Sequence, residues 1–450
     1  MGNTLLGGPI RRVAFASMIG TTIEWYDFFL YGTASALVFN RLFFPNYDSL
    51  TGTLASFGTF AAGFVARPIG GIVCGHFGDR RGRKSMLILT LLIMGIATSA
   101  IGLLPTYNQI GIWAPILLIT LRLAQGFAVG GEWAGAVLMA VEHSPKGSRG
   151  FYGSWPQIGV PAGLLASTVM FWQVSKLPEA AFLAWGWRLC FLVSVVMVAV
   201  GLFIRLAVME PQVFLEVKQT RSQSRMPVID VLRRHPKGVL LAMGAKIEDF
   251  AVFYLFTVFV LVYATLPRIG FSRDRVLMAV SIAAAIELFT IPIFGALSDR
   301  LGRRPVYLFG AILVGVLAFP LFWMIETSST PLMILSIVLA LPIGQAAMYG
   351  PQASFFSELF GTETRYSGAS LGYQTASVLG GLCPILATVL LKRTGGSWAI
   401  SLALMGLAVI TTASVWVASE TAHIDFRANS KAQPALSGAS SVEAAQPIQQ

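Results

Sequence analysis

Two ten-residue stretches that repeat each other between apolar segments decide the fold of this chain. Residues 75–84 read GHFGDRRGRK, and residues 295–304, 220 positions later, read GALSDRLGRR. Two triplets with the same internal spacing of seven and five residues lie 216 positions apart: Glu142, Arg149 and Ser154, then Glu358, Arg365 and Ser370. Two motifs at nearly one offset predict two structural repeats in parallel orientation, with a site between them.

The composition places these repeats in a membrane. Hydrophobic residues make up 55% of the 450 residues and charged residues only 12%, and the mean hydropathy is +0.71. A soluble chain has roughly 25% charged residues, so this one has too few charges to cover a soluble surface. A membrane-spanning helix needs about 20 apolar residues, and twelve of them fit within the apolar content.

The apolar segments predict an all-α integral membrane protein with twelve transmembrane helices in two six-helix bundles. The widest polar gap, residues 209–237, separates a bundle at 13–208 from a bundle at 238–419. We expect a cytoplasmic N-terminus at 1–12 and a disordered tail at 420–450. The predicted spans are residues 13–39, 52–77, 85–104, 112–141, 151–175, 182–208, 238–266, 276–297, 305–325, 331–357, 366–391 and 397–418.

The basic residues predict the orientation of the chain. The formal net charge is +11, from 32 Lys and Arg against 21 Asp and Glu. With both termini in the cytoplasm, 21 basic residues lie in or at the edge of cytoplasmic segments and 7 in external loops, as the positive-inside rule requires. The charge therefore indicates topology and no nucleic-acid partner. The cysteines, Cys74, Cys190 and Cys383, lie in apolar stretches and indicate neither disulfides nor a zinc site.

The repeated stretches fit the pattern GxxxDRxGRR/K, which resembles the signature of the major facilitator superfamily. Four other stretches resemble its metabolite:proton symporter family: EWYDF at 24–28, RPIGG at 67–71, RLAQGFAVGGEW at 122–133 and WGWR at 185–188. The resemblance covers about residues 10–420. It implies a multi-pass protein of the bacterial inner membrane that transports a small molecule by alternating access. The tail has no heptads, so the coiled-coil osmosensing of some family members is not expected.

Two carboxylates in the first span are candidates for proton coupling. Glu24 and Asp27 lie three residues apart and share one helix face. A carboxylate within a membrane span is costly and indicates function. The alternative is a static ion pair with a basic residue of a neighbouring helix.

Basic residues within the spans are candidates for binding an anionic substrate. Arg presents a fork that matches a carboxylate. The resemblance adds that family members with carboxylate substrates have arginines matching Arg67 and Arg188. For Arg122 the alternative is a pair with Glu132 or a first-span carboxylate. The substrate-binding candidates are Arg67, Arg122, Arg188, Lys246 and Gln374.

Further acidic and amide positions within the spans remain open. Lys246 and Asp249 lie one turn apart, so a mutual ion pair is expected, with a cavity-facing role as the alternative. Glu248 and Glu287 also lie within spans and have no assigned role. Gln345, Gln352 and Gln374 could bind substrate hydroxyls or join helices, and Tyr373 is expected to pack.

The repeated motif itself is expected to act as a gate. Its carboxylate can cap the next helix and meet basic groups of the other half, whereas the alternative is anchoring of basic residues at the membrane surface. The residues are Asp79, Arg80, Arg83 and Lys84 in the first half and Asp299, Arg300, Arg303 and Arg304 in the second.

The predicted function is proton-coupled uptake of a small organic acid, foremost a shikimate-like hydroxylated monocarboxylate. Dicarboxylates, zwitterionic osmolytes and drug efflux by antiport are the alternatives. The four histidines lie in or at the edge of cytoplasmic segments or in the tail and form no catalytic or metal motif, so neither an enzyme nor a metal or cofactor site is expected. The expected partners are the acid, a proton and the lipid bilayer, and we expect the chain to act as a monomer.

Overall fold

Helices are the only regular structure in the part of the chain that the computed structural model describes, namely residues 7–81, 83–130, 137, 140–141, 144–145, 147–207, 236–360 and 365–422. Side chains are described for residues 15, 17–74, 86, 88–130, 137, 140–141, 144–145, 147–203, 236–360, 368–369 and 371–422. Nearly all of the predicted central loop at 209–237, and the tail from residue 423, lie outside the described residues.

The first six predicted spans correspond to the helices of the N-terminal half. The first helix begins at Gly7, before the predicted start at residue 13, and several spans contain a short π-helical segment labelled η. The elements are α1 (Gly7–Ala34), η1 (Ser35–Phe39), α2 (Asn40–Leu42), α3 (Ser49–Arg81), α4 (Arg83–Leu103), α5 (Tyr107–Ile110), α6 (Trp113–Val129), α8 (Arg149–Ser175), α9 (Glu179–Ala181), η2 (Phe182–Gly186), α10 (Trp187–Leu192) and α11 (Ser194–Ala207).

The C-terminal half repeats this arrangement. Its elements are α14 (Pro236–Tyr254), η3 (Leu255–Phe259), α15 (Val260–Tyr263), α16 (Arg273–Leu301), α17 (Arg303–Glu326), α18 (Thr330–Val338), η4 (Leu339–Gln345), α19 (Ala346–Leu359), α20 (Arg365–Thr394) and α21 (Trp398–Val417). Eight of the described helical segments are long and apolar enough to cross a membrane. Helices satisfy their own backbone hydrogen bonds, which a segment in lipid requires.

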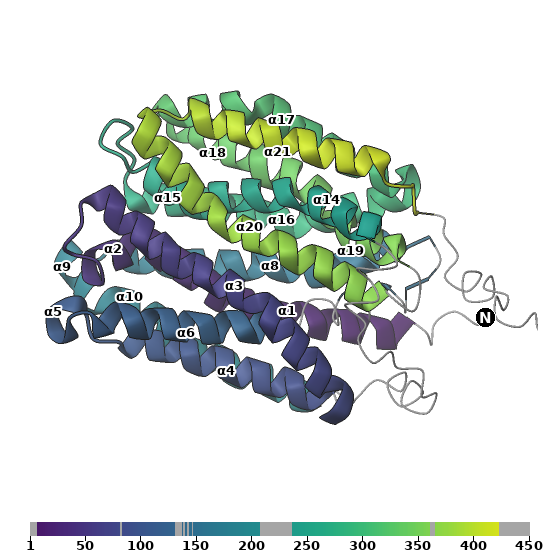
Figure 1. Cartoon of the computed structure of the whole chain (residues 1–450), viewed down its shortest axis with the longest axis horizontal. Helices are drawn as coiled ribbons and strands as arrows, with labels where there is room; N and C mark the ends of the chain where they lie inside the picture. The colour runs from purple at the N-terminus through teal and green to yellow at the C-terminus, as the bar shows by residue number, and fades with distance from the viewer. Residues whose placement is uncertain are drawn as a thin grey trace, which may run out of the picture.

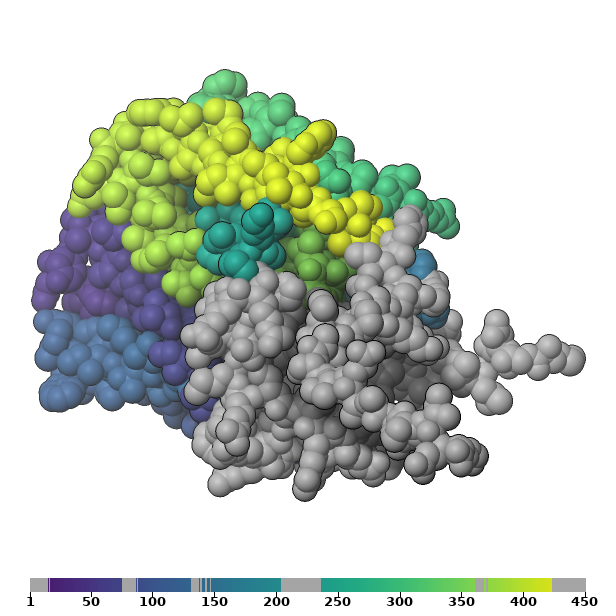
Figure 2. All heavy atoms as spheres, turned by 45° about the vertical axis from the view of Figure 1, so that its right-hand side comes forward, coloured from purple at the N-terminus to yellow at the C-terminus, as the bar shows by residue number. Residues whose placement is uncertain are grey.

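The two halves lie side by side, with the N-terminal helices in purple and blue and the C-terminal helices in green and yellow (Figure 1). Helix α8 packs against α1 of its own half and against α16 of the other, and α3 packs against α6 and α20. Figure 2 shows α20 and α21 running above the purple and blue N-terminal helices on the visible face. The halves therefore meet where α8 packs against α16 and α19 and where α3 packs against α20.

The bundle has two ends, which are named here by the chain. The termini end carries the beginning of α1 and the end of α21, and the far end carries α5, α9 and the connection after α15 (Figure 1). Apolar side chains fill the interior between the ends, and one cluster of buried residues runs through both halves.

Helices α3 and α6 cross with their backbones in contact, because glycines stand at the crossing. A Cβ atom on Gly126 would meet the backbone carbonyl of Gly63, and one on Gly130 would meet that of Arg67. Small residues permit such close approach between membrane helices. The crossing brings the segments that carry Arg67 and Arg122 together inside the N-terminal half.

We expect Gly126→Ala to destabilise the protein, because its methyl group must displace the backbone of α3. Overpacking of this kind costs about 1–3 kcal/mol, which the melting temperature of the purified protein in detergent will report as a decrease. Gly58→Ala is the matched control on α3, since no atom lies within 4 Å of a Cβ at that position. Equal melting temperatures for both variants would show that the crossing tolerates a side chain.

Candidate functional site

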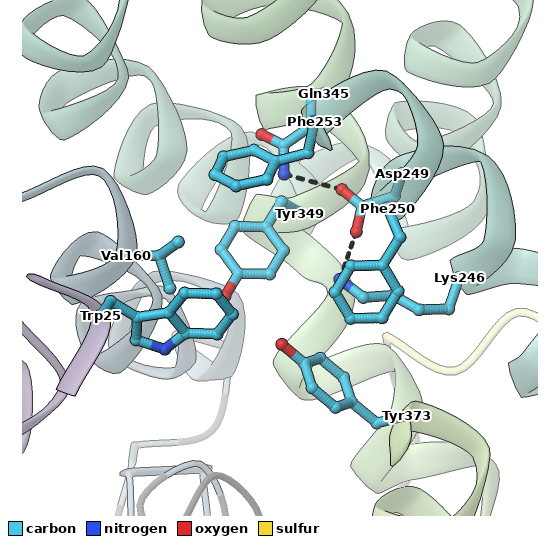
Figure 3. A pocket seen from close by; sticks show the side chains of 9 residues that line it. All are labelled: Trp25, Val160, Lys246, Asp249, Phe250, Phe253, Gln345, Tyr349 and Tyr373. Carbon is cyan, nitrogen blue, oxygen red and sulfur yellow. Dashed lines mark hydrogen bonds and ion pairs between the residues drawn. The ribbon is translucent and has the colours of Figure 1, made fainter. Parts of the chain in front are cut away.

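A small closed pocket lies between the halves in the middle of the bundle (Figure 3). Its volume is about 10 Å³, which is barely enough for one water molecule. The halves must therefore move apart before the pocket can hold an organic molecule. The lining residues are Trp25 and Val160 from the N-terminal half and Lys246, Asp249, Phe250, Phe253, Gln345, Tyr349 and Tyr373 from the C-terminal half.

An ion pair forms the polar wall of the pocket. Lys246 on α14 contacts the Oδ2 atom of Asp249 one turn later, and both side chains are 1% exposed. The Lys246 ammonium also donates to Gln352 Oε1 at 2.7 Å, while Gln345 donates to Asp249 Oδ1 at 2.8 Å. Gln352 in turn donates to the hydroxyl of Tyr307 at 2.9 Å. Lys246 thus forms the expected ion pair with Asp249 and also lines the cavity, which was the alternative.

Aromatic rings surround the ammonium group of Lys246. Its Nζ atom lies 4.1 Å from the ring centre of Phe250, 4.5 Å from that of Tyr349 and 4.7 Å from that of Tyr373. Figure 3 shows the hydroxyl ends of Tyr349 and Tyr373 directed towards Trp25 of the other half. The faces of these rings attract a cation, so they stabilise the ammonium group at the pocket in addition to its ion pair with Asp249.

Two arginines lie buried in the N-terminal half and contact the same aromatic ring. The guanidinium carbon of Arg67 lies 4.4 Å from the ring centre of Phe28, and that of Arg122 lies 4.1 Å from it. Arg67 is 1% exposed and Arg122 is fully buried. Arg67 also stacks at 5.3 Å on Trp25, which lines the pocket.

Much of the hydrogen-bonding capacity of these arginines is unused. Arg122 donates to Gln125 Oε1 at 3.1 Å and, through Nε, to the carbonyl of Phe60 at 3.4 Å. Within the described part of the chain, the Nη2 atom of Arg122 and the Nε and Nη2 atoms of Arg67 have no hydrogen-bond partner. Unpartnered buried donors cost free energy, so these groups are suited to receive an anion.

Asp27 connects to Arg122 through neutral side chains. Ser194 donates a hydrogen bond to Asp27 Oδ1, and Thr98 is a second hydrogen-bonding neighbour of the same carboxyl. Gln125 donates to Thr98 at 2.7 Å and accepts from Arg122. Asp27 is therefore linked to Arg122 through Thr98 and Gln125 and forms no ion pair with it. Glu24 is also buried, at 6% exposure.

The remaining candidates occupy other places. Arg188 donates to the carbonyls of Gly102 and Leu104 at the end of α4, at 2.9 and 2.7 Å. This placement away from the pocket does not favour its predicted role in substrate binding. Gln374 on α20 donates to the carbonyl of Gly130 at 3.0 Å and so joins the halves. Glu132 lies outside the described residues.

Sequence reasoning missed the aromatic residues of the site. Phe28 packs against both arginines, and Tyr349 lines the pocket, yet neither was a candidate. A signal for Tyr349 was present, because Gln345, Tyr349 and Gln352 recur at intervals of four and three and share one helix face. In an apolar helix, that polar stripe predicts a cavity-facing surface.

At the termini end, the second copy of the repeated motif binds the opposite half. Asp299 accepts hydrogen bonds from the backbone N–H groups of Gly150 and Phe151 at 2.8 and 2.9 Å. These groups belong to the first turn of α8, where backbone donors have no partner within the helix. Asp299 therefore caps α8 across the interface, and Arg303 holds its Oδ1 atom at 2.7 Å.

Arg303 organises the surrounding ion pairs. It contacts Glu358 at 3.2 Å, and Arg149 lies 4.0 Å from the same carboxylate. Arg149 of the first repeated triplet thus meets Glu358 of the second across the two halves. Arg304 donates to backbone carbonyls at the end of α21, and Arg300 is exposed. The side chains of Asp79, Arg80, Arg83 and Lys84 lie outside the described part.

The expected tail does not begin at Glu420. Its carboxylate accepts hydrogen bonds from the backbone N–H groups of Arg303 and Arg304 at 2.8 and 3.0 Å and so caps α17. Thr421 donates to Glu358 at 2.7 Å. Partial burial raises the pKa of Glu420, but these backbone donors outweigh it and hold the pKa below its usual value. The composition of the segment could not predict that Glu420 is ordered, because its contacts are with a helix distant in sequence.

Ion pairs also connect the halves at the far end. Glu179 of α9 contacts Arg41 of its own half and Arg273 of α16, the latter at 2.6 Å. Lys392 of α20 lies 3.5 Å from Asp48, just before α3. The described helices are therefore bridged at both ends, with the small pocket enclosed between them.

The family model of the Major Facilitator Superfamily matches residues 17–382. The chain belongs to the major facilitator superfamily. This confirms the predicted fold of two six-helix bundles, and as a member of this superfamily the chain is a membrane transporter and not an enzyme. The expected superfamily was thus correctly identified from the repeated motif.

Individual relatives of this major facilitator chain carry different solutes. It is 43% identical over 399 residues to the shikimate transporter of Escherichia coli, covering 88% of this chain and 91% of that protein. It is 33% identical over 427 residues to the proline/betaine transporter of the same organism, covering 92% and 85%. A partially occluded inward-open structure of the Escherichia coli xylose transporter XylE has the same fold, with a TM-score of 0.71 at 19% identity over 92% of this chain and 98% of that one.

We expect Asp299→Asn to open the termini end of this transporter. The change removes the charge and one acceptor of the α8 cap, and a hydrogen bond to a charged group contributes about 1.5–3 kcal/mol. In a background without the native cysteines, maleimide should label a cysteine at the buried Ser154 about tenfold faster. Arg275→Gln, at an exposed position near the other end of α16, should leave the rate unchanged. Equal rates in both variants would exclude the cap as a determinant of closure.

The far-end contact of Asp48 should not depend on pH in the physiological range. The Thr51 hydroxyl and backbone N–H donate to Asp48, and together with nearby Lys392 they hold its pKa below the usual value. A contact that depends on a carboxylate with a lowered pKa is lost only when the pH falls through that pKa. Spin labels at the exposed Tyr47 and Arg393 should thus report one distance distribution from pH 8 to pH 5.

Asp48→Asn is the comparison for that measurement. This variant should broaden the distribution equally at every pH in this range. A transition between pH 5 and pH 8 that is present in the wild type and absent in the Asp48→Asn variant would contradict the assignment.

Proposed function

We propose that this transporter is a proton-coupled symporter of a small organic acid, foremost a hydroxylated monocarboxylate of the shikimate kind. The observation that carries the proposal is the pair of buried arginines, Arg67 and Arg122, whose guanidinium groups keep unpartnered donors, with Arg67 stacked on Trp25 of the central pocket. The similarity to the shikimate transporter supports the substrate class.

The chemistry of the site suits a hydroxylated acid. A guanidinium group binds a carboxylate through two parallel hydrogen bonds, and a dry interior strengthens the attraction. Across the pocket, Gln345 Oε1 has no hydrogen-bond partner within the described residues and could accept from a substrate hydroxyl. Once the halves separate, a molecule with its carboxylate towards Arg67 and its hydroxyls towards Gln345 would satisfy both sides.

Lys246 is a second cation that could bind the substrate carboxylate, and Asp249 competes for it. Its partner Asp249 holds it in the closed pocket. A substrate carboxylate that approaches Lys246 must compete with Asp249, which limits the affinity and favours release. Substrate binding and the opening of the ion pair are thereby coupled in this proposal.

We assign the coupled proton to Asp27, with Glu24 as its neighbour on the same helix face. Asp27 is 1% exposed and has hydroxyl partners but no cationic partner among the described residues. A buried carboxylate without a counter-ion favours its neutral form. The proton on Asp27 balances the charge of one substrate carboxylate and couples uptake to the pH gradient.

The proposed orientation places the termini end in the cytoplasm of a bacterium, because basic residues concentrate in its loops. The contacts of Asp299 then form the inner gate and those of Glu179 and Lys392 the outer gate. Alternating access consists of breaking one set while the other persists.

A zwitterionic osmolyte is the second candidate substrate. The proline/betaine relative and the aromatic lining around Lys246 favour it, because quaternary ammonium groups bind aromatic faces. Lys246 already occupies these faces, however, and two further buried cations lie nearby. An anion therefore fits the charges of the site better than a zwitterion does.

Uptake of labelled shikimate into cells that lack their own shikimate carrier tests the proposal. Uptake should rise as the outside pH is lowered, since external protons load Asp27, and a protonophore should abolish accumulation. Arg67→Gln should reduce uptake by about tenfold or more, because it leaves the substrate carboxylate buried with less counter-charge. The exposed-site variant Arg275→Gln should retain uptake at wild-type expression.

Asp27→Asn separates coupling from binding. It should abolish proton-driven accumulation but preserve exchange of shikimate across the membrane. Accumulation that persists in Asp27→Asn would exclude Asp27 as the proton carrier. Uptake of betaine in place of shikimate would select the second candidate.

A further inference from the structure

Two carboxylic acids in the C-terminal half are buried without any hydrogen-bond partner. Glu248 on α14 and Glu287 on α16 are both fully buried. None of their four carboxyl oxygens has a partner within the described residues. Neither side chain has a role in the site described above.

The depth of Glu287 makes its ionised form costly. It is the fifteenth residue of α16, which begins at Arg273 and ends at Leu301, and so lies at the middle of this membrane-spanning helix. An isolated carboxylate at such a depth is strongly disfavoured, and the group takes up a proton instead. The same reasoning applies to Glu248, so both are neutral acids in the closed conformation.

The two acids differ in the helix face that they occupy. Glu287 precedes Ser298 by eleven residues, or three turns, and so lies on the same side of α16. Ser298 and Gly295 face the opposite half, since a Cβ atom on Gly150 of α8 would lie 2.7 Å from the Ser298 hydroxyl. Glu287 therefore lies on the surface along which the two halves separate.

Glu248 lies inside the C-terminal bundle. It follows Gly244 by one turn, and a Cβ atom on Gly244 would meet Ser414 of α21. Thr411 of α21 accepts from the backbone N–H of Glu248 and donates to the carbonyl of Gly244. This face stays covered by α21 when the halves move as rigid bodies.

The charged surroundings of Glu287 are few. Asp249 of α14 is the charged group that acts on it among the described residues, and Asp249 is itself paired with Lys246. The charged groups of α8 and α19, Arg149 and Glu358, lie together at the termini end. Within the described residues, no cation therefore stabilises an ionised Glu287 while the halves are closed.

We propose that Glu287 carries a second transported proton. Opening of the interface between α8 and α16 exposes its carboxyl group to water, which allows it to bind a proton on the acidic side and release it on the other. Glu248 remains covered throughout and keeps its proton. The inference rests on the proposed symport: with protons on both Asp27 and Glu287, import of a monocarboxylate moves one net positive charge.

Potential-driven uptake into proteoliposomes tests the second proton. With the full-length protein and labelled shikimate, an inside-negative potassium diffusion potential should accelerate wild-type uptake. Glu287→Gln should keep uptake driven by the pH gradient and lose the response to the potential. Glu248→Gln, the matched loss of a buried acid, should keep both responses. A wild type without a potential response, or a Glu287→Gln variant that retains it, would overturn the proposal.

Infrared spectroscopy of the purified protein gives a readout that needs no substrate. Glu287→Gln and Glu248→Gln should each remove a carbonyl band of a protonated carboxylic acid. After transfer to deuterium oxide, the band assigned to Glu287 should shift sooner than that of Glu248, because only Glu287 gains access to water. Absence of the Glu287 band, or equally slow exchange of both, contradicts the inference even where shikimate proves not to be the substrate.

Discussion

The cost of placing charge inside a membrane organises this structure. A charged side chain at the centre of a span costs about 2.5–3.5 kcal/mol on insertion scales, unless partners offset it. The chain meets this cost differently in each half. Lys246 and Asp249 neutralise each other, whereas Arg67 and Arg122 are held by aromatic faces with donors to spare. The N-terminal half therefore has cations with free donors that suit an anion. In the C-terminal half, an anion can bind Lys246 only when Asp249 gives it up.

Carboxylates that cap helices distant in sequence close the termini end. Asp299 caps α8 of the opposite half, and Glu420 caps α17 within its own half. Both carboxylates satisfy backbone donors that a helix end leaves unpaired. A cap contributed by the other half can be withdrawn when the halves move, while one from the same half moves with its helix. This difference makes the Asp299 contact suited to gating and the Glu420 contact suited to bracing.

The glycines between α3 and α6 explain why the two arginines share one aromatic ring. Direct backbone contact at Gly126 and Gly63 leaves no space for side chains at the crossing. Arg67 and Arg122 therefore both reach the ring of Phe28, and Arg67 also stacks on Trp25, which lines the pocket. The site depends on residues without side chains as much as on those that carry charge.

The amino-acid sequence by itself determined the fold class, the approximate spans, the superfamily and the set of charges that lie within the membrane. Apolar length, the positive-inside bias and the motif at 75–84 and 295–304 are local signals, so they can be read along the chain. Only the tertiary structure decided which charges are paired. Arg188 is bound to carbonyls near the end of α4, and Arg122 is linked to Asp27 only through Gln125 and Thr98. The carboxyl groups of Glu248 and Glu287 have no hydrogen-bond partner among the described residues. Such pairing depends on how helices distant in sequence rotate and cross, which no local periodicity specifies.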